Sequence, residues 1–343
     1  MTENLVYDTY QPTLNELRYT FGGHEPVRGL KPGEVLTLYT EDCFGAAVHG
    51  IDDLPSKVCE MPYLNGVTGP FFVAGAEPGD TLAVHFLDIE PARDWGVSAT
   101  FPHFGALTST HTTATLQAPL EERVWRYDID TAARIVRFQA RNSDFSIDLP
   151  LAPMQGTVGV APAGGQALST ITSDVHGGNL DTPEIRAGVT LYLPVAVHGA
   201  LLALGDGHAR QGRGEVSGVA VETAMRTTIT VDVLKGVTTS TPRIETDDML
   251  MSIGCARPLE DAARTAGADM VAWIAELTGL DTLDAYQLIA QAGDTTVGNV
   301  VDPAYTMLAG MPKRLLGGTV IQQGVHDRLR STPWPPAPGG GAS

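Results

Sequence analysis

The segment Ser173–Asp181 (SDVHGGNLD) is the densest run of polar side chains in the chain. It brings together an imidazole, an amide and a carboxylate, those of His176, Asn179 and Asp181. The two glycines after His176 allow the backbone to turn sharply and to approach a ligand closely. We interpret the segment as a loop of a binding or catalytic site, with ordinary Gly-Gly turn chemistry as the alternative.

A second polar segment follows the next apolar run. It reads GDGH at Gly205–His208 and continues to Gln211, Glu215 and Glu222. Residues two apart in an extended chain face the same side, so Asp206 and His208 could both reach one ion or one water. Nitrogen and oxygen ligands suit zinc, manganese or iron, whereas calcium takes more oxygens. The alternative is a glycine-rich hairpin whose Asp and His satisfy its own backbone.

Both segments are expected to be mounted on β-strands. Short runs rich in Val, Thr and Leu, divided by Gly, Pro and Asp turn signals, dominate the first 250 residues. The expected strands are Glu34–Tyr39, Thr81–Ile89, Ile135–Gln139, Val189–Pro194, Gly218–Glu222 and Thr228–Val233. This spacing predicts a mainly-β chain with a β-sandwich or barrel-like fold and a few C-terminal helices.

Helical periodicity is confined to the C-terminal part. Helices are expected over Pro258–Leu277 and Leu283–Ala292, with Thr282 capping the second, and they should pack on the sheet without entering the site. We predict a mainly-β catalytic region over 1–250 and a C-terminal α/β part over 251–330, packed on it in one compact unit. The Pro- and Gly-rich end, 331–343, is predicted to be a disordered tail.

The composition of the chain excludes some classes of binding partner. The 40 acidic and 22 basic side chains give a net charge of −18, which argues against nucleic acid and anionic membranes as partners. No window reaches the ~18 uninterrupted apolar residues of a membrane-spanning helix. The N-terminus lacks the pattern of a signal peptide, so a cytoplasmic location is expected.

Nucleophilic side chains have little support as the source of catalysis. No G-x-S-x-G elbow occurs, and no lysine lies between Lys57 and Lys235 to complete a Glu–Lys–Cys mechanism. The three cysteines are far apart and are expected to be buried reduced thiols: Cys43, Cys59 and Cys255. Four other histidines are expected to be structural or to lie outside the site: His85, His103, His111 and His198.

Five strings, in order along the chain, resemble the acetamidase/formamidase family. They are GPFFVAGAEPGDTLAVHFLDI (Gly69–Ile89), GTVGVAPA (Gly156–Ala163), HGGNLDTPEIRAGVTLYLPV (His176–Val195), GALLALGDGHARQGRGEVSGVAVE (Gly199–Glu222) and DAYQLIAQAGDTTVGNVVDP (Asp284–Pro303). The resemblance implies a mainly-β fold, a homo-oligomer, and hydrolysis of small linear amides such as formamide and acetamide to ammonia and a carboxylate. A zinc-containing γ-lactamase is among the family's members.

The resemblance also implies roles for particular residues. A divalent metal would be held by Asp42, His176, Asp206 and His208, with zinc as the first choice and manganese or calcium as alternatives. Glu215 would move the proton from the water to the leaving amine, Asn179 would hold the substrate amide or oxyanion, and Asp181 would be a further catalytic group.

Two departures from the family's pattern concern charge. Arg213 stands where the family usually has an acid, and Ala74 stands in Val73–Glu77 where the family usually has a glutamate. Two alternative functions remain: hydrolysis of a γ-lactam or another C–N bond, and non-catalytic binding of a cation or ligand by a β-sandwich.

Overall fold

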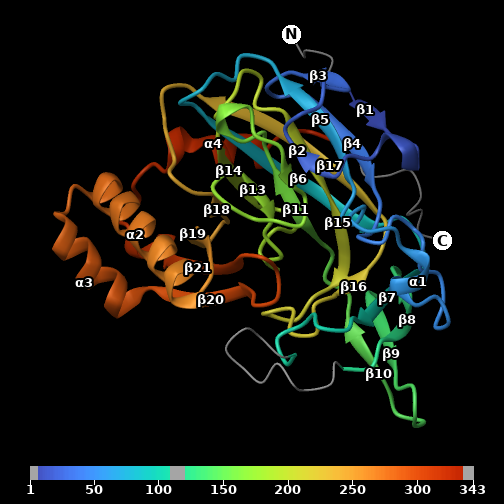
Figure 1. The fold of residues 1–343 in the computed structure, drawn as a ribbon. Helices are drawn as coiled ribbons and strands as arrows, with labels where there is room; N and C mark the ends of the chain where they lie inside the picture. Colours follow the sequence, from blue (N-terminus) through green and yellow to red (C-terminus); the bar gives the residue numbers. More distant parts are fainter. Residues whose placement is uncertain (1–6, 109–119, 335–343) are drawn as a thin grey trace.

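The computed structural model describes residues 7–108 and 120–334. In these ranges the chain forms two large sheets, a small ribbon of β2 (Thr20–Phe21) with β12 (Leu168–Ser169), and four α-helices (Figure 1). The mainly-β prediction is confirmed, and neither of the two large sheets closes into a barrel. His111 and residues 335–343 of the expected tail lie outside the described residues.

The first large sheet has nine strands, in the order β1-β4-β17-β6-β14-β18-β19-β21-β20. Their bounds are β1 Tyr7–Tyr10, β4 Val35–Thr40, β17 Met225–Leu234, β6 Thr81–Pro91, β14 Thr190–Pro194, β18 Arg243–Glu245, β19 Met249–Ala256, β21 Tyr305–Pro312 and β20 Asp294–Asn299. The strand β19 crosses the boundary expected at residue 250, and the two expected parts of the chain therefore share this sheet.

The second large sheet runs β10-β9-β8-β7-β16-β15-β11-β13, with β5 paired to β15 and β3 paired to β5. Its strands are β10 Ser146–Pro150, β9 Ile135–Gln139, β8 Arg123–Asp130, β7 Trp95–Thr100, β16 Val221–Glu222, β15 Leu202–Arg210, β11 Met154–Gly159, β13 Gly177–Asn179, β5 Val67–Val73 and β3 Arg28–Leu30. The central strands β15 and β11 carry or face most of the predicted site residues.

The two sheets enclose the main hydrophobic core. Leu38, Phe86 and Ile229 from the first sheet pack in one cluster with Phe71 and Leu204 from the second, and all five are fully buried. Burial of large apolar side chains from both inner faces is what holds a β-sandwich together. The site described below therefore stands on strands that the core makes rigid.

Two predicted strands differ from the structure. Of the expected Gly218–Glu222 strand only Val221–Glu222 pairs, because Gly218 has a φ of 95° and belongs to a turn. The segment expected as a loop after His176 instead forms β13, which pairs antiparallel with β11. Positive φ values of 90° at Gly177 and 97° at Gly178 make this short irregular strand possible.

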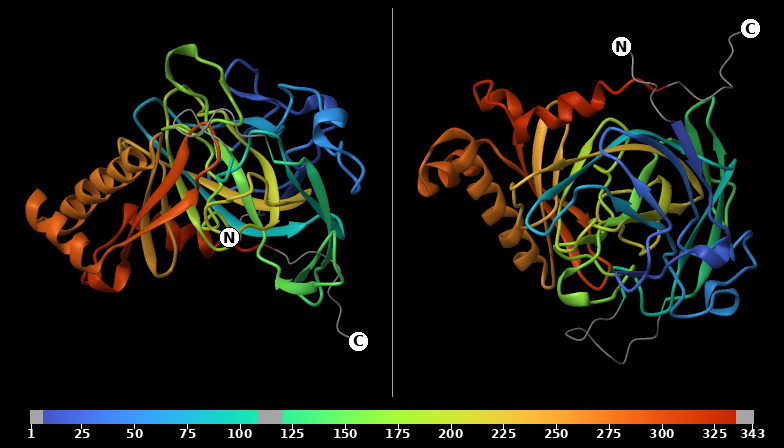
Figure 2. Two further views of the ribbon diagram at one scale, coloured as in Figure 1. Left: turned by 60° about the horizontal axis from the view of Figure 1, so that its bottom comes forward. Right: turned by 90° about the horizontal axis from the view of Figure 1, so that it is seen from above.

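The long helices lie at one side of the molecule (Figure 2). Helix α2 (Leu259–Thr278) packs on β19 and β21 through a cluster that includes Met270, Trp273 and Met311. Helix α3 is Thr282–Ala292, and α1 (Pro55–Val58) and α4 (Val325–Arg330) are short. The predicted Thr282 cap is wrong: the Asp281 side chain accepts from the backbone N–H groups of Leu283 and Asp284.

No helix of the described ranges is long and apolar enough to cross a membrane.

Candidate active site

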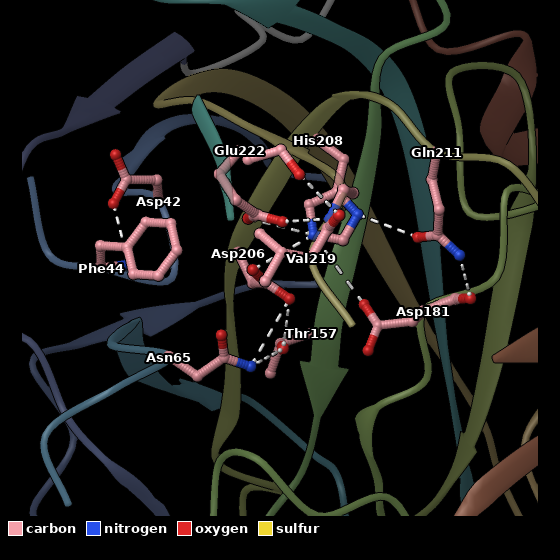
Figure 3. A network of polar contacts seen from close by, with 12 residues as sticks. Asp42, Phe44, Asn65, Thr157, Asp181, Asp206, His208, Gln211, Val219 and Glu222 are labelled. Atoms are coloured by element: carbon pink, nitrogen blue, oxygen red, sulfur yellow. Dashed lines mark hydrogen bonds and ion pairs between the residues drawn. The ribbon is translucent and has the colours of Figure 1, made fainter. Parts of the chain in front are cut away.

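Strand β15 places Asp206 and His208 side by side in the interior (Figure 3). Their side chains are 3% and 1% exposed, and His208 Nε2 lies 3.2 Å from Asp206 Oδ1. The GDGH string, which was interpreted as an extended segment, lies within β15, paired with β11. The strand backbone thus holds both side chains, which positions them more firmly than a loop would.

The facing strand β11 leaves the space that these side chains need. A Cβ atom added to Gly156 would lie 2.3 Å from Asp181 Oδ1, 2.4 Å from Asp206 Oδ2 and 2.9 Å from His208 Cε1. All three distances are far below van der Waals contact. Only glycine at position 156 allows the three groups to meet.

Gln211 fixes the orientation of the His208 ring. Gln211 Nε2 donates to the backbone oxygens of Asp181 at 2.7 Å and Gly298 at 3.4 Å. Gln211 Oε1 must then be the atom 3.0 Å from His208 Nδ1, so Nδ1 carries a hydrogen and donates it. In the neutral ring, the lone pair is consequently on Nε2, the nitrogen that faces the carboxylates.

Three carboxylate oxygens surround this nitrogen. The distances from His208 Nε2 are 3.2 Å to Asp206 Oδ1, 3.3 Å to Glu222 Oε2 and 4.0 Å to Asp181 Oδ1. All three oxygens are buried, and none has a hydrogen-bond partner among the described residues. Ligands about 2.0 Å from a tetrahedral metal ion lie about 3.3 Å from one another. The donor set and its spacing therefore fit a divalent metal.

The charges of the site also favour a bound cation. Burial lowers the pKa of His208, but Glu222 and Asp206 outweigh burial and raise it well above its ordinary value. Burial raises the pKa of Glu222 to about 7, although the charge of His208 opposes this. Anionic oxygens in a low-dielectric interior need a counter-charge, so either a proton or a metal ion belongs at Nε2.

Two more acids, Glu215 and Asp302, join the group. Ligand atoms of Asp181, His208 and Glu215 lie within 4.8 Å of one another. Burial, followed by the charge of Asp181, raises the pKa of Glu215 well above its ordinary value. Burial, Asp302 and Asp206 raise the pKa of Asp181 well above its ordinary value, and burial raises that of Asp302 in the same direction. The neighbouring negative charges therefore favour a proton or a cation among these acids.

Three of these acids adopt a backbone conformation that side chains disfavour. The φ values are 40° for Asp181, 62° for Asp206 and 47° for Glu215. Such conformations cost of order 1–3 kcal/mol each and persist where the surroundings impose them, commonly at functional sites. The strain falls on the carboxylates that converge on His208.

Asn179 lies beside the acids with its amide already oriented. Its Oδ1 accepts from Asn65 Nδ2 at 2.6 Å and from the Thr157 hydroxyl, and its Nδ2 donates to Asp302 Oδ2 at 3.1 Å. One hydrogen on Nδ2 is left after these bonds. Asn179 thus offers a single positioned donor at the site.

Two expected metal ligands stand apart from this group. Asp42 is fully buried, but its Oδ1 accepts from the backbone N–H of Phe44 at 2.9 Å (Figure 3). Arg93 forms an ion pair with its Oδ2. His176 is buried against Phe21, with ring centroids 5.1 Å apart, and neither ring nitrogen has a hydrogen-bond partner among the described residues. Neither residue lines the cavity described next.

A cavity of about 70 Å³ opens beside the acids. Its polar wall is made by Asn65, Asn179, Asp181, Asp206, Glu215, Glu222 and Asp302, together with the Cys43 thiol. Its apolar wall is made by Phe44, Leu64, Phe101, Phe104, Ile171 and Val219. A cavity needs about 10–15 Å³ on this scale to hold one water, so this one accommodates a molecule of a few heavy atoms.

Arg213, which departs from the family's pattern, does not line this cavity. Its side chain is 52% exposed and forms an ion pair with Glu184. The added positive charge is therefore compensated at the surface.

The sequence analysis assigned no role to several residues of the site. Asp302 lies in the NVVDP end of a string that resembles the family, and Glu222 closes another, so both carried a signal. Asn65 had none, because its neighbours Leu64 and Gly66 show no polar pattern. Gln211 was noticed, but its function depends on which atoms it faces.

We expect Gln211→Leu to weaken binding of a divalent metal by about 10–100-fold, the usual effect of removing a group that orients a metal-binding histidine. The change leaves His208 in place but removes the acceptor for its Nδ1–H. Apparent dissociation constants for zinc, measured by competition with a chelator, test this. The matched control is Gln139→Leu, on the exposed side of β9. Equal affinity in both variants would contradict the orienting role.

Burial of His176 predicts a loss of stability in acid. Burial lowers its pKa to about 4, against the opposing charge of Asp174. In the unfolded chain the His176 imidazole takes up a proton below a pH of about 6.5, whereas in the folded chain it does so only below about 4. Between these two pH values protons bind preferentially to the unfolded chain, so the free energy of unfolding falls as the pH drops. The expected contribution between pH 7.5 and 5 is about 2 kcal/mol.

Urea unfolding at the two pH values measures this contribution. His176→Leu should lose less stability on acidification than the wild type, whereas His198→Leu, at an exposed position, should not differ from it. An undiminished loss in His176→Leu would show that His176 does not titrate as its burial requires.

The fold and the site together define a mainly-β protein with a buried group of carboxylates around one imidazole. The chain belongs to the Acetamidase/Formamidase family, whose model matches residues 23–164 and 147–258. The resemblance found in the sequence is thereby confirmed. Members of this family act on the carbon–nitrogen bond of amides.

Solved structures and a curated relative agree with this assignment. The chain is 40% identical to an acetamidase from Yersinia enterocolitica, with a TM-score of 0.85 over 92% of this chain and 94% of that chain. An acetamidase from Bacillus halodurans is 30% identical, with a TM-score of 0.80 over 92% of this chain and 100% of that chain. An acetamidase from Mycolicibacterium smegmatis is 28% identical over 242 residues, 55% of this chain. The chain spans only 56% to 60% of the length of the curated relatives that it matches.

Proposed function

We propose that this protein hydrolyses small linear amides, of the formamide and acetamide type, to ammonia and a carboxylate with the help of a bound divalent metal. The observation that carries the proposal is the convergence on His208 Nε2 of three carboxylate oxygens that have no hydrogen-bond partner among the described residues, beside a small cavity. Family membership supports the amide as substrate.

The metal would be held by His208 and Asp206 together with Asp181 and Glu222. One imidazole nitrogen and carboxylate oxygens at this spacing favour zinc, with manganese next, whereas calcium takes six to eight oxygens. When bound, such an ion lowers the pKa of a water to about 7 and polarises a carbonyl oxygen. For Asp42 we propose a different role from the expected one: it holds Arg93, which also pairs with Glu41 and donates to the hydroxyl of Thr223, next to Glu222.

Glu215 is the residue that we assign to proton transfer. Among the described residues no group donates a hydrogen bond to its carboxylate, and the side chain lines the cavity. A carboxylate with free lone pairs and a raised pKa can take a proton from a water near neutral pH and return it to the departing nitrogen. This transfer avoids the expulsion of an amide anion.

Asn179 and Asn65 would orient the substrate. Asn65 and Thr157 hold the Asn179 amide from one side and Asp302 holds it from the other. The remaining Nδ2 hydrogen of Asn179 is available to an amide or oxyanion oxygen in the cavity. Fixed donors of this kind stabilise the negative charge that develops as an amide carbonyl is attacked.

Ammonia release from formamide and acetamide, and formation of the ring-opened amino acid from a γ-lactam, test the proposal together with metal analysis of the same preparation. Turnover of a linear amide that follows metal content is expected. Turnover of the γ-lactam alone would assign a different C–N bond, and metal binding without any turnover would leave a cation-binding protein. The proposal includes a homo-oligomer, which the family resemblance supports and which light scattering on a size-exclusion column measures.

A further inference from the structure

The cavity is lined by both polar and apolar groups. The carboxylates and the two asparagine amides form its polar wall, and Phe44, Phe101 and Phe104 belong to its apolar wall. An amide group needs hydrogen bonds that only the polar wall offers. The hydrocarbon substituent of any amide that reacts here must therefore face the apolar wall.

Phe104 is held firmly in that wall. A Cβ atom added to Gly218 would lie 2.5 Å from Phe104 Cδ1 and 2.6 Å from Cε1, so the ring rests directly on the glycine backbone. On another side the ring meets Phe101 edge to face, with centroids 6.1 Å apart. The glycine can accept the ring because it has no side chain.

The chain around Phe104 is tied to the loop that carries Glu215. The Ala106 N–H donates to the Val216 carbonyl at 2.9 Å, and the Gly218 N–H donates to the Glu215 carbonyl at 2.7 Å. Phe104 consequently keeps a fixed position relative to the proton-transfer residue. A ring held in this way limits space instead of adapting to the substrate.

We propose that Phe104 sets the largest hydrocarbon substituent that this enzyme accepts on its amide substrate. The inference rests on the proposed function and adds the residue that determines substrate size. A cavity of about 70 Å³ leaves room for an amide group and a short substituent, and the Phe104 phenyl group occupies the space where a longer one would lie. Removal of the Phe104 side chain should allow the cavity to accept an amide that carries a phenyl substituent.

The test compares kcat/KM for benzamide and acetamide in the metal-loaded wild type and in Phe104→Ala. The ratio of the two values should rise at least about tenfold, since even one methylene in an apolar pocket changes kcat/KM by about 10–200-fold. The ratio is taken within one preparation, so partial unfolding of the variant cancels out. Phe145→Ala, at a ring that is 59% exposed near the β9–β10 turn, is the matched control and should leave the ratio unchanged.

Phe104→Trp is a second variant, which should shift the substrate preference toward smaller substituents. It should lower the kcat/KM ratio of butyramide to acetamide, because a larger ring shortens the space for the substituent. An unchanged ratio in either variant, or equal loss for both substrates in a folded Phe104→Ala protein, would overturn the inference and leave the proposed function intact. A wild type that hydrolyses no amide would overturn the proposed function, and this inference with it.

Discussion

Glu215→Gln is expected to lower kcat by about 10²–10⁴ while the metal content and the substrate affinity stay near those of the wild type. The two side chains have nearly the same shape, but the amide cannot accept the proton of a water. No hydrogen bond from the described residues depends on the Glu215 carboxylate, so the substitution should not disturb the backbone turn at Gly212–Gly218. Stopped-time ammonia assays and metal analysis of the same samples measure both quantities.

Glu260→Gln is the matched control for this experiment. Glu260 lies in the first turn of α2, on the helix that packs on β19 and β21 and away from the cavity. Its replacement should leave turnover within tenfold of the wild type. The opposite result for Glu215, loss of the metal together with the activity, would make Glu215 a ligand, since its oxygens lie close to Asp181 and His208. The base would then be sought among Asp42, Asp181 and Glu222.

Local pattern was sufficient to place most of the strands that were expected from the sequence. Alternation and β-branched residues gave Thr81–Ile89 and Ile135–Gln139, and the structure has β6 at Thr81–Pro91 and β9 at Ile135–Gln139. Pattern failed where glycine changes the backbone. Gly218 keeps the expected strand from beginning before Val221, whereas Gly205 and Gly207 remain inside β15, where Val67 of β5 and Met225 of β17 approach them closely. Which of these outcomes a glycine produces depends on strands far away in the sequence.

The candidate site was only partly visible in the sequence for a similar reason. Asp206 and His208 share a face of one strand, and that relation follows from their spacing. Their approach to Glu222 and Asp181 depends on sheet order, because β16 and β11 lie on either side of β15. The sequence also does not show which group pairs with a given carboxylate. Asp42 could be recognised as an acid at a strand end, but its ion pair with Arg93 could not be predicted.

His208→Ala is expected to remove the metal and the activity together. His208 offers the only imidazole nitrogen in this group of described carboxylates, and the three oxygens around it would lose the ligand that completes their set. Metal-dependent polarisation of substrate and water is worth several kcal/mol, so turnover should fall by at least about 10³-fold at trace metal concentrations. Excess zinc or manganese should restore part of it, because the affinity for the metal, and not the carboxylate chemistry, is what the substitution reduces.

His198→Ala is the matched control, since its side chain is 63% exposed, its ring contacts Glu77 and Phe72, and it does not line the cavity. It should keep full metal content and activity. Titration of each metal-free protein with zinc, followed by both calorimetry and ammonia release, separates binding from catalysis. For His208→Ala the two curves should shift together to higher zinc concentration. A variant that retains its zinc yet remains inactive would assign His208 to the substrate and not to the metal, and the ion would then have to be held by the carboxylates alone.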